Sequence, residues 1–144
     1  MMNIFLLEIE EIKQKYQMIQ DLDEIVQLFN EVKKIKPKSI LEIGIERGGT
    51  FKLWEQLILS NYPSGYLCGI DTNINNILWG WGKSSLEIDV IKGRSQDVYS
   101  LVVGFLTEVR EFDFIFIDGD HSYEGVKSDY NLYSTLIRKG GLIG

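Results

Sequence analysis

A Gly-rich segment between a predicted strand and a predicted helix constrains this 144-residue chain more than any other feature. Ser39–Gly44 reads as a buried strand, and a helix is expected from about Thr50 to Ser60. The turn between them carries Gly44, Gly48 and Gly49. Glycine lets the backbone approach a ligand closely, and the first turn of a helix presents N–H groups without partners. The segment therefore predicts a ligand cradle at the carboxyl end of the first strand.

The rest of the chain alternates apolar runs with helical patterns. Tyr66–Ile70, Leu86–Lys92 and Phe112–Ile117 predict three further strands, and Leu142–Gly144 begins a fifth. A strand–helix–strand unit places its two strands parallel in one sheet. We therefore predict an α/β, doubly wound (Rossmann-like), mainly parallel sheet of about five strands. The expected order is 3-2-1-4-5, with helices on both flanks.

Helices are also expected before the sheet, over about residues 3–35. A first helical stripe joins apolar residues at alternating spacings of four and three: Phe5, Ile9, Ile12, Tyr16 and Ile19. A second helix should end before Pro37, because the residue before a proline avoids the α region. We predict that residues 1–36 form a helical segment that packs on the sheet as a lid or packing layer. Residues 37–144 form the ligand-binding domain.

The helix after the fourth strand and the 72–85 segment have less regular patterns. Ser122 can cap that helix, and Lys139-Gly140-Gly141 should end it. Its expected buried face is Val126, Tyr130, Tyr133 and Ile137. Residues 72–85 are rich in Asn and Trp and show no period, so we expect a short helix and a loop near the ligand there.

Composition excludes several classes of function. The net charge is −6 and no basic cluster is present, which argues against nucleic acid as a partner. No apolar run is long enough to cross a membrane, and the N-terminus lacks the pattern of a signal peptide. The one cysteine, Cys68, lies in an apolar run and cannot form a disulfide within the chain. These features predict a cytoplasmic protein with no membrane partner.

Polar residues or glycines follow the ends of the predicted strands. Asp71 ends the second strand, residues 93–97 follow the third, and residues 118–121 follow the fourth. In a doubly wound sheet, ligands bind at these carboxyl ends. Asp71 follows the Gly-rich turn at the distance of a carboxylate that accepts hydrogen bonds from ribose hydroxyls. The alternative is that Asp71 caps the next segment.

The spacing of the glycines separates two kinds of cofactor. A dinucleotide fingerprint requires G-x-G-x-x-G, but Glu46 stands at the position of the middle glycine. A carboxylate there would face a pyrophosphate, which disfavours NAD and FAD. A ligand with a positive charge and no phosphate would tolerate Glu42 and Glu46 nearby. S-adenosylmethionine is such a ligand.

Three motifs carry a resemblance to a known family: residues 41–50 (LEIGIERGGT), 69–71 (GID) and 114–130 (FIFIDGDHSYEGVKSDY). They resemble class I S-adenosylmethionine-dependent methyltransferases. Within that class they are most similar to the small-molecule O-methyltransferase branch, which includes cephalosporin-hydroxylase-like and macrolide-sugar methyltransferases. The resemblance covers about residues 38–144. It implies transfer of a methyl group from S-adenosylmethionine to a hydroxyl of a small-molecule or sugar acceptor.

The resemblance also implies roles for single residues. In cofactor binding, Glu42, Gly44 and Gly48 would line the methionine end, Asp71 would bind the ribose, and Ser95 and Gln96 would lie near the adenine. Asp118 belongs to the cofactor site and matches a position that holds a divalent cation, typically Mg²⁺, in metal-dependent members. Asp120 is a candidate second oxygen ligand for that cation.

His121 matches the region of the catalytic base in related O-methyltransferases. It is the one histidine of the chain, and its ordinary pKa suits removal of a proton from a hydroxyl near neutral pH. The alternative is a structural bond to Asp118 or Asp120.

The fold of this family normally continues past the fifth strand, whereas the sequence stops at Gly144. We therefore expect a chain truncated after that strand, with an intact cofactor half and a sheet edge open to pairing with a second copy. A catalytically incomplete S-adenosylmethionine-binding module that needs a partner is the main alternative. An NAD-type oxidoreductase is disfavoured by Glu46. A hydroxylase is a further alternative, because one relative in this branch is named for that chemistry. No feature of the sequence indicates redox chemistry.

Overall fold

The computed structural model describes residues 4–77, 84–106 and 111–144. Helices and strands alternate along it, as the apolar pattern predicts. The elements are α1 (Ile4–Lys15), α2 (Leu22–Lys34), β1 (Ser39–Ile43), α3 (Gly49–Asn61), β2 (Tyr66–Asp71), η1 (Ile74–Asn76), β3 (Glu87–Lys92), α4 (Ser95–Phe105), β4 (Phe112–Ile117), α5 (Tyr123–Tyr133), η2 (Ser134–Leu136) and β5 (Ile137–Ile143). The 3-10 helix η1 is the short helix expected in 72–85. Residues 78–83 of that segment, with the two Trp-Gly pairs, lie outside the described residues.

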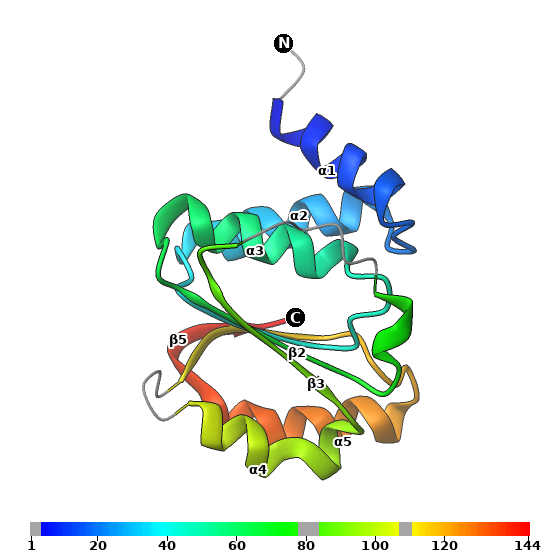
Figure 1. Ribbon diagram of the computed structural model, residues 1–144, viewed down its shortest axis with the longest axis vertical. Coiled ribbons are helices and arrows are strands. Elements are labelled where there is room, and N and C mark those ends of the chain that lie inside the picture. The colour runs from blue at the N-terminus through cyan, green and yellow to red at the C-terminus, as the bar shows by residue number, and fades with distance from the viewer. Residues whose placement is uncertain (1–3, 78–83, 107–110) are drawn as a thin grey trace.

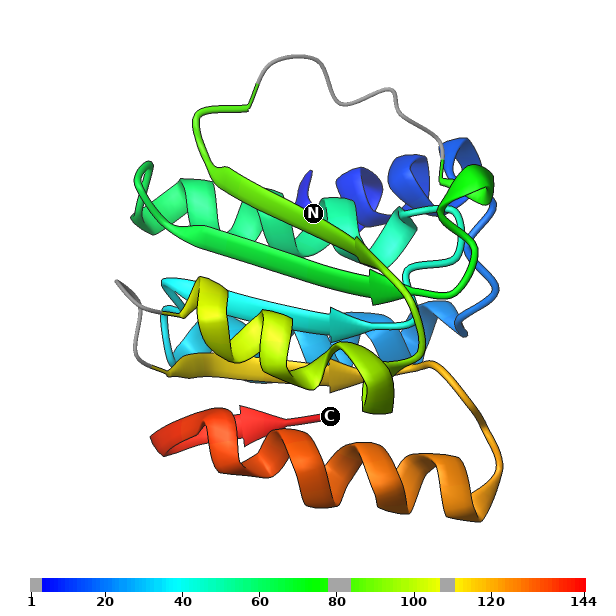
Figure 2. The same cartoon turned by 60° about the horizontal axis from the view of Figure 1, so that its bottom comes forward.

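The five strands form one sheet in the order β3-β2-β1-β4-β5, which confirms the predicted fold class and strand order. Every neighbouring pair is parallel. Figure 2 shows the strand arrows pointing to one end of the sheet, where η1 and the connection between α1 and α2 also lie. The carboxyl ends of the strands therefore share one edge with two connecting segments.

Helices cover both faces of the sheet (Figure 1). α2 and α3 lie on one face with α1 outside them, and α4 and α5 lie on the other. Trp54 of α3 is at the centre of the first face, stacked on Phe29 of α2 at 6.0 Å and edge-on to Phe114 of β4 at 5.1 Å. These buried rings join α2 and the sheet into one hydrophobic core.

A second buried cluster lies between the sheet and the α4–α5 layer. It includes Cys68 of β2, which is buried as expected of a strand cysteine. Burial raises the pKa of the Cys68 thiol to about 12, so this thiol stays protonated and unreactive.

The prediction for the C-terminal part of the chain is wrong in one respect. The helix does not continue to residues 139–141. α5 ends at Tyr133, and β5 begins at Ile137, which pairs with Phe112 of β4. Gly140 has a φ of +82°, and the pairing register shifts between Phe112 and Phe114. The two glycines therefore form an irregularity in an edge strand rather than the end of a helix.

The predicted buried face of α5 is wrong in part: Tyr133 is buried as predicted, but two of the other residues are not. Val126 and Tyr130 are exposed, whereas Gly125, Asp129 and Tyr133 are buried. Residues spaced four apart in the sequence fit the predicted face and the observed face of α5 equally well. A buried carboxylate decides between them, because Asp129 finds hydrogen-bond donors on α4.

The first helix ends earlier than its apolar stripe suggests. α1 ends at Lys15, and Ile19 lies in the connection to α2 with 75% of its surface exposed. Met18 anchors that connection on α3, because its side chain fills the space in which a Cβ on Gly49 would lie. Lys13 holds the same connection by donating from Nζ to the carbonyls of Met18 (2.9 Å) and Gln20 (2.5 Å). Among the described residues, no helix is long and apolar enough to cross a membrane.

Candidate functional site

A cavity of about 690 Å³ lies at the carboxyl ends of the strands. Seven residues predicted from the sequence line it: Gly44, Asp71, Ser95, Gln96, Asp118, Asp120 and His121. They come from the ends of β1, β2 and β4 and from the start of α4. The volume is within the usual range of small-molecule sites. The structure therefore brings most of the predicted site residues together.

The turn after β1 passes directly beneath the loop after β4. Gly44 has a φ of +88°, and a Cβ added to it would lie 2.2 Å from the carbonyl oxygen of Asp118. The Gly44 N–H donates to the carbonyl of Ile70 at 2.8 Å, and the Asp118 N–H donates to the carbonyl of Ile43 at 2.8 Å. These bonds hold the ends of β1, β2 and β4 at one point, and only glycine fits there.

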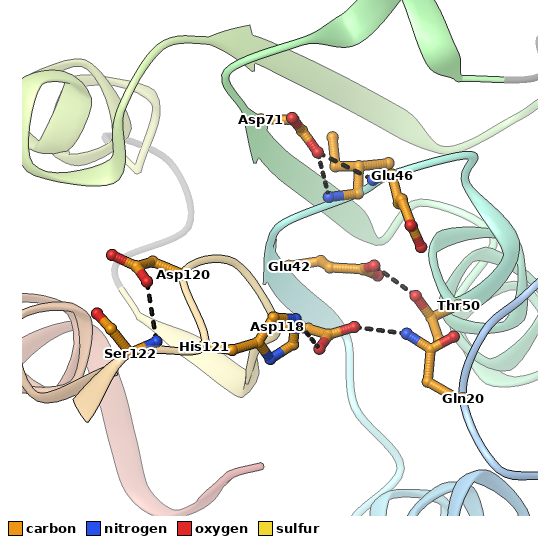
Figure 3. Close-up of polar contacts among 10 residues, drawn as sticks. Gln20, Glu42, Glu46, Thr50, Asp71, Asp118, Asp120, His121 and Ser122 are labelled. Atoms are coloured by element: carbon orange, nitrogen blue, oxygen red, sulfur yellow. Dashed lines mark hydrogen bonds and ion pairs between the residues drawn. The ribbon is translucent and has the colours of Figure 1, made fainter. Parts of the chain in front are cut away.

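Asp71 fixes the Gly-rich turn from the end of β2. Its Oδ2 accepts hydrogen bonds from the N–H groups of Ile45 (2.8 Å) and Glu46 (2.9 Å), as Figure 3 shows. Its Oδ1 accepts one bond from the N–H of Asn73 at 2.9 Å. Glu46 has a φ of 55°, an uncommon backbone conformation for a residue with a Cβ. Asp71 thus both caps the next segment and holds the cradle, with accepting capacity left on Oδ1.

Glu42 and Gly48 do not line the cavity. Gly48 is the left-handed residue before α3, with a φ of 94°. Glu42 is completely buried, and its Oε1 accepts a hydrogen bond from the hydroxyl of Thr50 (Figure 3). Among the described residues, neither Glu42 Oε2 nor the indole N–H of Trp54 has a hydrogen-bond partner within bonding geometry.

Burial raises the pKa of Glu42 well above its ordinary value. Thr50 and the nearby Trp54 lower this pKa, while the charges of Asp118 and Asp71 raise it further. Desolvation is the dominant cause, since a charged carboxylate in an apolar surrounding is costly. Glu42 is therefore a neutral acid beneath the cavity at pH values where an exposed glutamate is ionised.

Replacing Glu42 with glutamine should reduce the fall in stability with rising pH. The folded protein keeps the Glu42 proton above pH 4.5, the ordinary value, whereas the unfolded chain releases it. This contribution to stability is therefore present at low pH and is lost as the pH rises through the folded pKa. Urea unfolding of wild type and Glu42→Gln between pH 4.5 and 8 measures it. Glu31→Gln, on the exposed surface of α2, is the control, and parallel wild-type and Glu42→Gln curves would contradict the prediction.

Asp118 lies at the end of β4 between two other segments. Its Oδ2 accepts a hydrogen bond of 2.5 Å from Nε2 of Gln20, which comes from the α1–α2 connection. Its Oδ1 lies 3.8 Å from Nε2 of His121, whose side chain is 82% exposed (Figure 3). Burial raises the pKa of Asp118, and the Gln20 hydrogen bond and the charge of His121 partly oppose that rise. Asp118 is the point where the N-terminal segment reaches the cavity.

The carboxylate of Asp120 is hydrogen-bonded within its own loop. Its Oδ1 accepts from the backbone N–H of Ser122 at 2.9 Å, and this bond lowers the pKa of Asp120. Within residues 4–77, 84–106 and 111–144, no group of three His, Cys, Asp or Glu side chains could hold a metal ion. Asp118 is one hard oxygen group at the cavity, of a kind that suits Mg²⁺ because that ion keeps several waters and uses one or two carboxylates.

The cavity is predominantly acidic. Carboxylates of Glu46, Asp71, Asp118, Asp120 and Asp129 line it, whereas Arg94 is its one lining Lys or Arg among the described residues. A negative lining attracts a cationic group and repels a pyrophosphate. The site therefore favours a ligand with a positive centre, in agreement with the cofactor class expected from the glycine spacing.

Comparison with known proteins places the chain in a family. Residues 41–144 match the model of the methyltransferase domain family (Methyltransf_24). The chain belongs to this methyltransferase family. A 31-residue stretch is 55% identical to uncharacterized protein R132 of Acanthamoeba polyphaga mimivirus, over 22% of this chain and 14% of that protein.

Solved methyltransferase structures share the fold. The MycE methyltransferase of the mycinamycin pathway, solved with Mg, SAH and mycinamycin VI, aligns with a TM-score of 0.66 at 20% identity. The alignment covers 94% of this chain and 37% of that one. The O-methyltransferase TomG of Streptomyces achromogenes, solved with SAM, aligns with a TM-score of 0.65 at 15% identity, over 99% and 65%. This methyltransferase domain thus spans less than two thirds of the length of either protein.

Sequence reasoning missed three residues that line the site of this methyltransferase domain. Ile19 and Gln20 come from the α1–α2 connection, and Asp129 comes from α5. Gln20 bonds a residue 98 positions away, and Asp129 bonds residues 33 and 34 positions away. No local pattern signals such contacts. For Asp129, the one available signal was its place in the 114–130 motif.

Proposed function

We propose that this methyltransferase domain binds S-adenosylmethionine and transfers its methyl group to a hydroxyl of a small molecule or sugar. The acidic cavity at the ends of β1, β2 and β4 carries the proposal, because it combines a glycine cradle with an excess of carboxylates. Those carboxylates suit a sulfonium and an ammonium group. The MycE and TomG structures support the cofactor class, since they were solved with SAH and with SAM.

The cofactor would lie across the ends of the central strands. Gly44 would let the methionine part approach the backbone, with Glu42 and Gly48 beneath and beside it. Asp71 Oδ1, which accepts one hydrogen bond within the chain, would accept others from the ribose hydroxyls. Ser95 and Gln96 at the start of α4 would contact the adenine.

His121 would act as the base for the acceptor hydroxyl. Its exposed ring beside Asp118 leaves the nitrogens accessible, and the carboxylate 3.8 Å away would stabilise the imidazolium that forms. When bound, S-adenosylmethionine would supply the methyl group and be left as S-adenosylhomocysteine, while His121 would take the proton of the acceptor hydroxyl. Mg²⁺, where bound, would be held by Asp118 and would lower the pKa of the acceptor hydroxyl.

Further proposals concern the surroundings of the site. A module that binds the cofactor and needs a partner for catalysis is the second candidate. A homo-oligomer would pair through β5, which lies at one edge of the sheet. The boundary between an N-terminal helical segment (residues 1–36) and the cofactor-binding domain (residues 37–144) is also a proposal. So is a cytoplasmic location. An NAD-type oxidoreductase is disfavoured by the acidic cavity.

Calorimetric titration with S-adenosylhomocysteine, with and without Mg²⁺, tests the proposal. We expect binding of S-adenosylhomocysteine and none of NAD. Asp118→Asn should abolish any Mg²⁺ dependence while the domain stays folded. Glu111→Gln is the control, since this residue is exposed near the opposite end of the sheet. A folded protein that binds NAD and not S-adenosylhomocysteine would overturn the proposal.

A further inference from the structure

Asp129 is a buried carboxylate whose hydrogen-bond partners among the described residues belong to the start of α4. Only 1% of its surface is exposed, yet it lines the cavity. Its Oδ1 accepts hydrogen bonds from the hydroxyl of Ser95 and, at 3.3 Å, from Nε2 of Gln96. Figure 1 shows α4 and α5 side by side on the same face of the sheet. One oxygen from α5 therefore controls two neighbouring polar side chains on α4.

These two bonds determine which polar atoms remain for a ligand. A carboxylate only accepts hydrogen bonds, so the amide nitrogen of Gln96 must face Asp129. Among the described residues, no donor is bonded to the Gln96 carbonyl Oε1. The single hydroxyl hydrogen of Ser95 is also used by Asp129, which leaves the Ser95 oxygen as an acceptor. Both side chains thus retain acceptors toward the cavity they line.

We propose that Asp129 is a positioning residue that fixes the amide of Gln96, so that the site selects a 6-amino purine over a 6-oxo purine. The inference rests on the proposed function, in which Ser95 and Gln96 contact the base of the cofactor. A 6-amino group donates to the Gln96 carbonyl, and the second amide hydrogen of Gln96 can reach a ring nitrogen. A 6-oxo purine presents an acceptor and a ring N–H instead. It would match only the flipped amide, which Asp129 prevents.

A merely structural role for Asp129 predicts a different result. In that case Asp129 would brace α5 against α4, and its loss would weaken all ligands equally. Tyr133 provides the matched control, because its hydroxyl joins the same two helices by donating to the carbonyl of Ser95 at 2.6 Å. Tyr133→Phe removes a brace without touching the amide of Gln96.

The experiment compares S-adenosylhomocysteine with S-inosylhomocysteine, its 6-oxo analogue, by calorimetric titration. Wild type should favour the adenosine form by about 10- to 100-fold, the range of one bidentate base contact. Asp129→Asn should bring this ratio to within about threefold of unity, since an asparagine lets the Gln96 amide flip. Tyr133→Phe should keep the wild-type ratio even where its melting temperature falls.

The outcomes separate the inference from the proposed function. Wild-type binding of S-adenosylhomocysteine with an unchanged ratio in Asp129→Asn would overturn the inference alone. A folded wild type that binds neither compound would overturn both. If Asp129→Asn does not fold, Gln96→Met carries the test, because it removes the amide and leaves Asp129 in place. Retention of the wild-type ratio by that variant would also overturn the inference.

Discussion

Replacing Gly44 with valine is expected to abolish binding of S-adenosylhomocysteine and to destabilise the domain. The new Cβ would lie 2.2 Å from the carbonyl oxygen of Asp118 and 2.7 Å from the Cα of Gly119, so the β4–α5 loop would have to move. The φ of +88° at Gly44 adds backbone strain for a β-branched residue. Overpacking and strain each cost about 1–3 kcal/mol, which gives a total of about 2–6 kcal/mol.

Titration calorimetry and urea unfolding measure the two effects of Gly44→Val. Gly104 of α4 is the control glycine, because a Cβ added there meets no neighbouring atom of the described residues within 4 Å. Gly104→Ala should bind the ligand as wild type does and should gain about 0.5–1 kcal/mol of stability from helix propensity. Wild-type affinity in a folded Gly44→Val variant would show that the turn after β1 does not contact the ligand.

Replacing Asp71 with alanine is expected to weaken binding of S-adenosylhomocysteine by at least about 100-fold, the effect of two lost charge-assisted bonds to the ribose. The same change removes the acceptor of three backbone N–H groups. Ile45 is buried, so its N–H would stay unpaired, whereas those of the exposed Glu46 and Asn73 can bond water. We expect a loss of about 1–3 kcal/mol in the free energy of unfolding.

Asp113 of β4 is the matched control for Asp71. Its Oδ2 accepts from the backbone N–H groups of Lys38 (2.6 Å) and Ser39 (3.0 Å), at the end of the sheet opposite the cavity. Asp113→Ala should therefore lower stability while the affinity for the ligand stays at the wild-type value. Calorimetry on both variants gives the comparison. Equal losses of affinity in Asp71→Ala and Asp113→Ala would mean that Asp71 acts through stability alone.

The 114–130 motif shows where sequence patterns stop being sufficient. Its strand, and the place of Asp118 directly after that strand, are correctly predicted, because an apolar run that ends in a carboxylate is a local signal. The orientation of α5 is not correctly predicted, because residues spaced four apart in the sequence fit two faces of the helix. The face that contains Asp129 is buried because Ser95 and Gln96 supply hydrogen bonds. A pattern of apolar residues carries no information about donors on another helix.

The N-terminal segment is a second case in which the sequence pattern predicts the helices but not their contacts. The sequence indicates helices there, and the structure adds that their connection reaches the site. Met18 packs on Gly49, and this contact places Gln20 against Asp118.

The sequence by itself determined the alternating strands and helices, the parallel sheet, the cradle at Gly44 and the carboxylates that end β2 and β4. These follow from local periodicity and from residues next to one another in the chain. Only the tertiary structure decided that Glu42 is buried as a neutral acid, that Gln20 contacts Asp118, and that Asp129 holds the start of α4. The physical reason is that burial and hydrogen bonding depend on groups brought together from distant positions. The strength of a hydrogen bond depends on the surrounding dielectric and on which donors are nearby. Both are defined only in the folded chain.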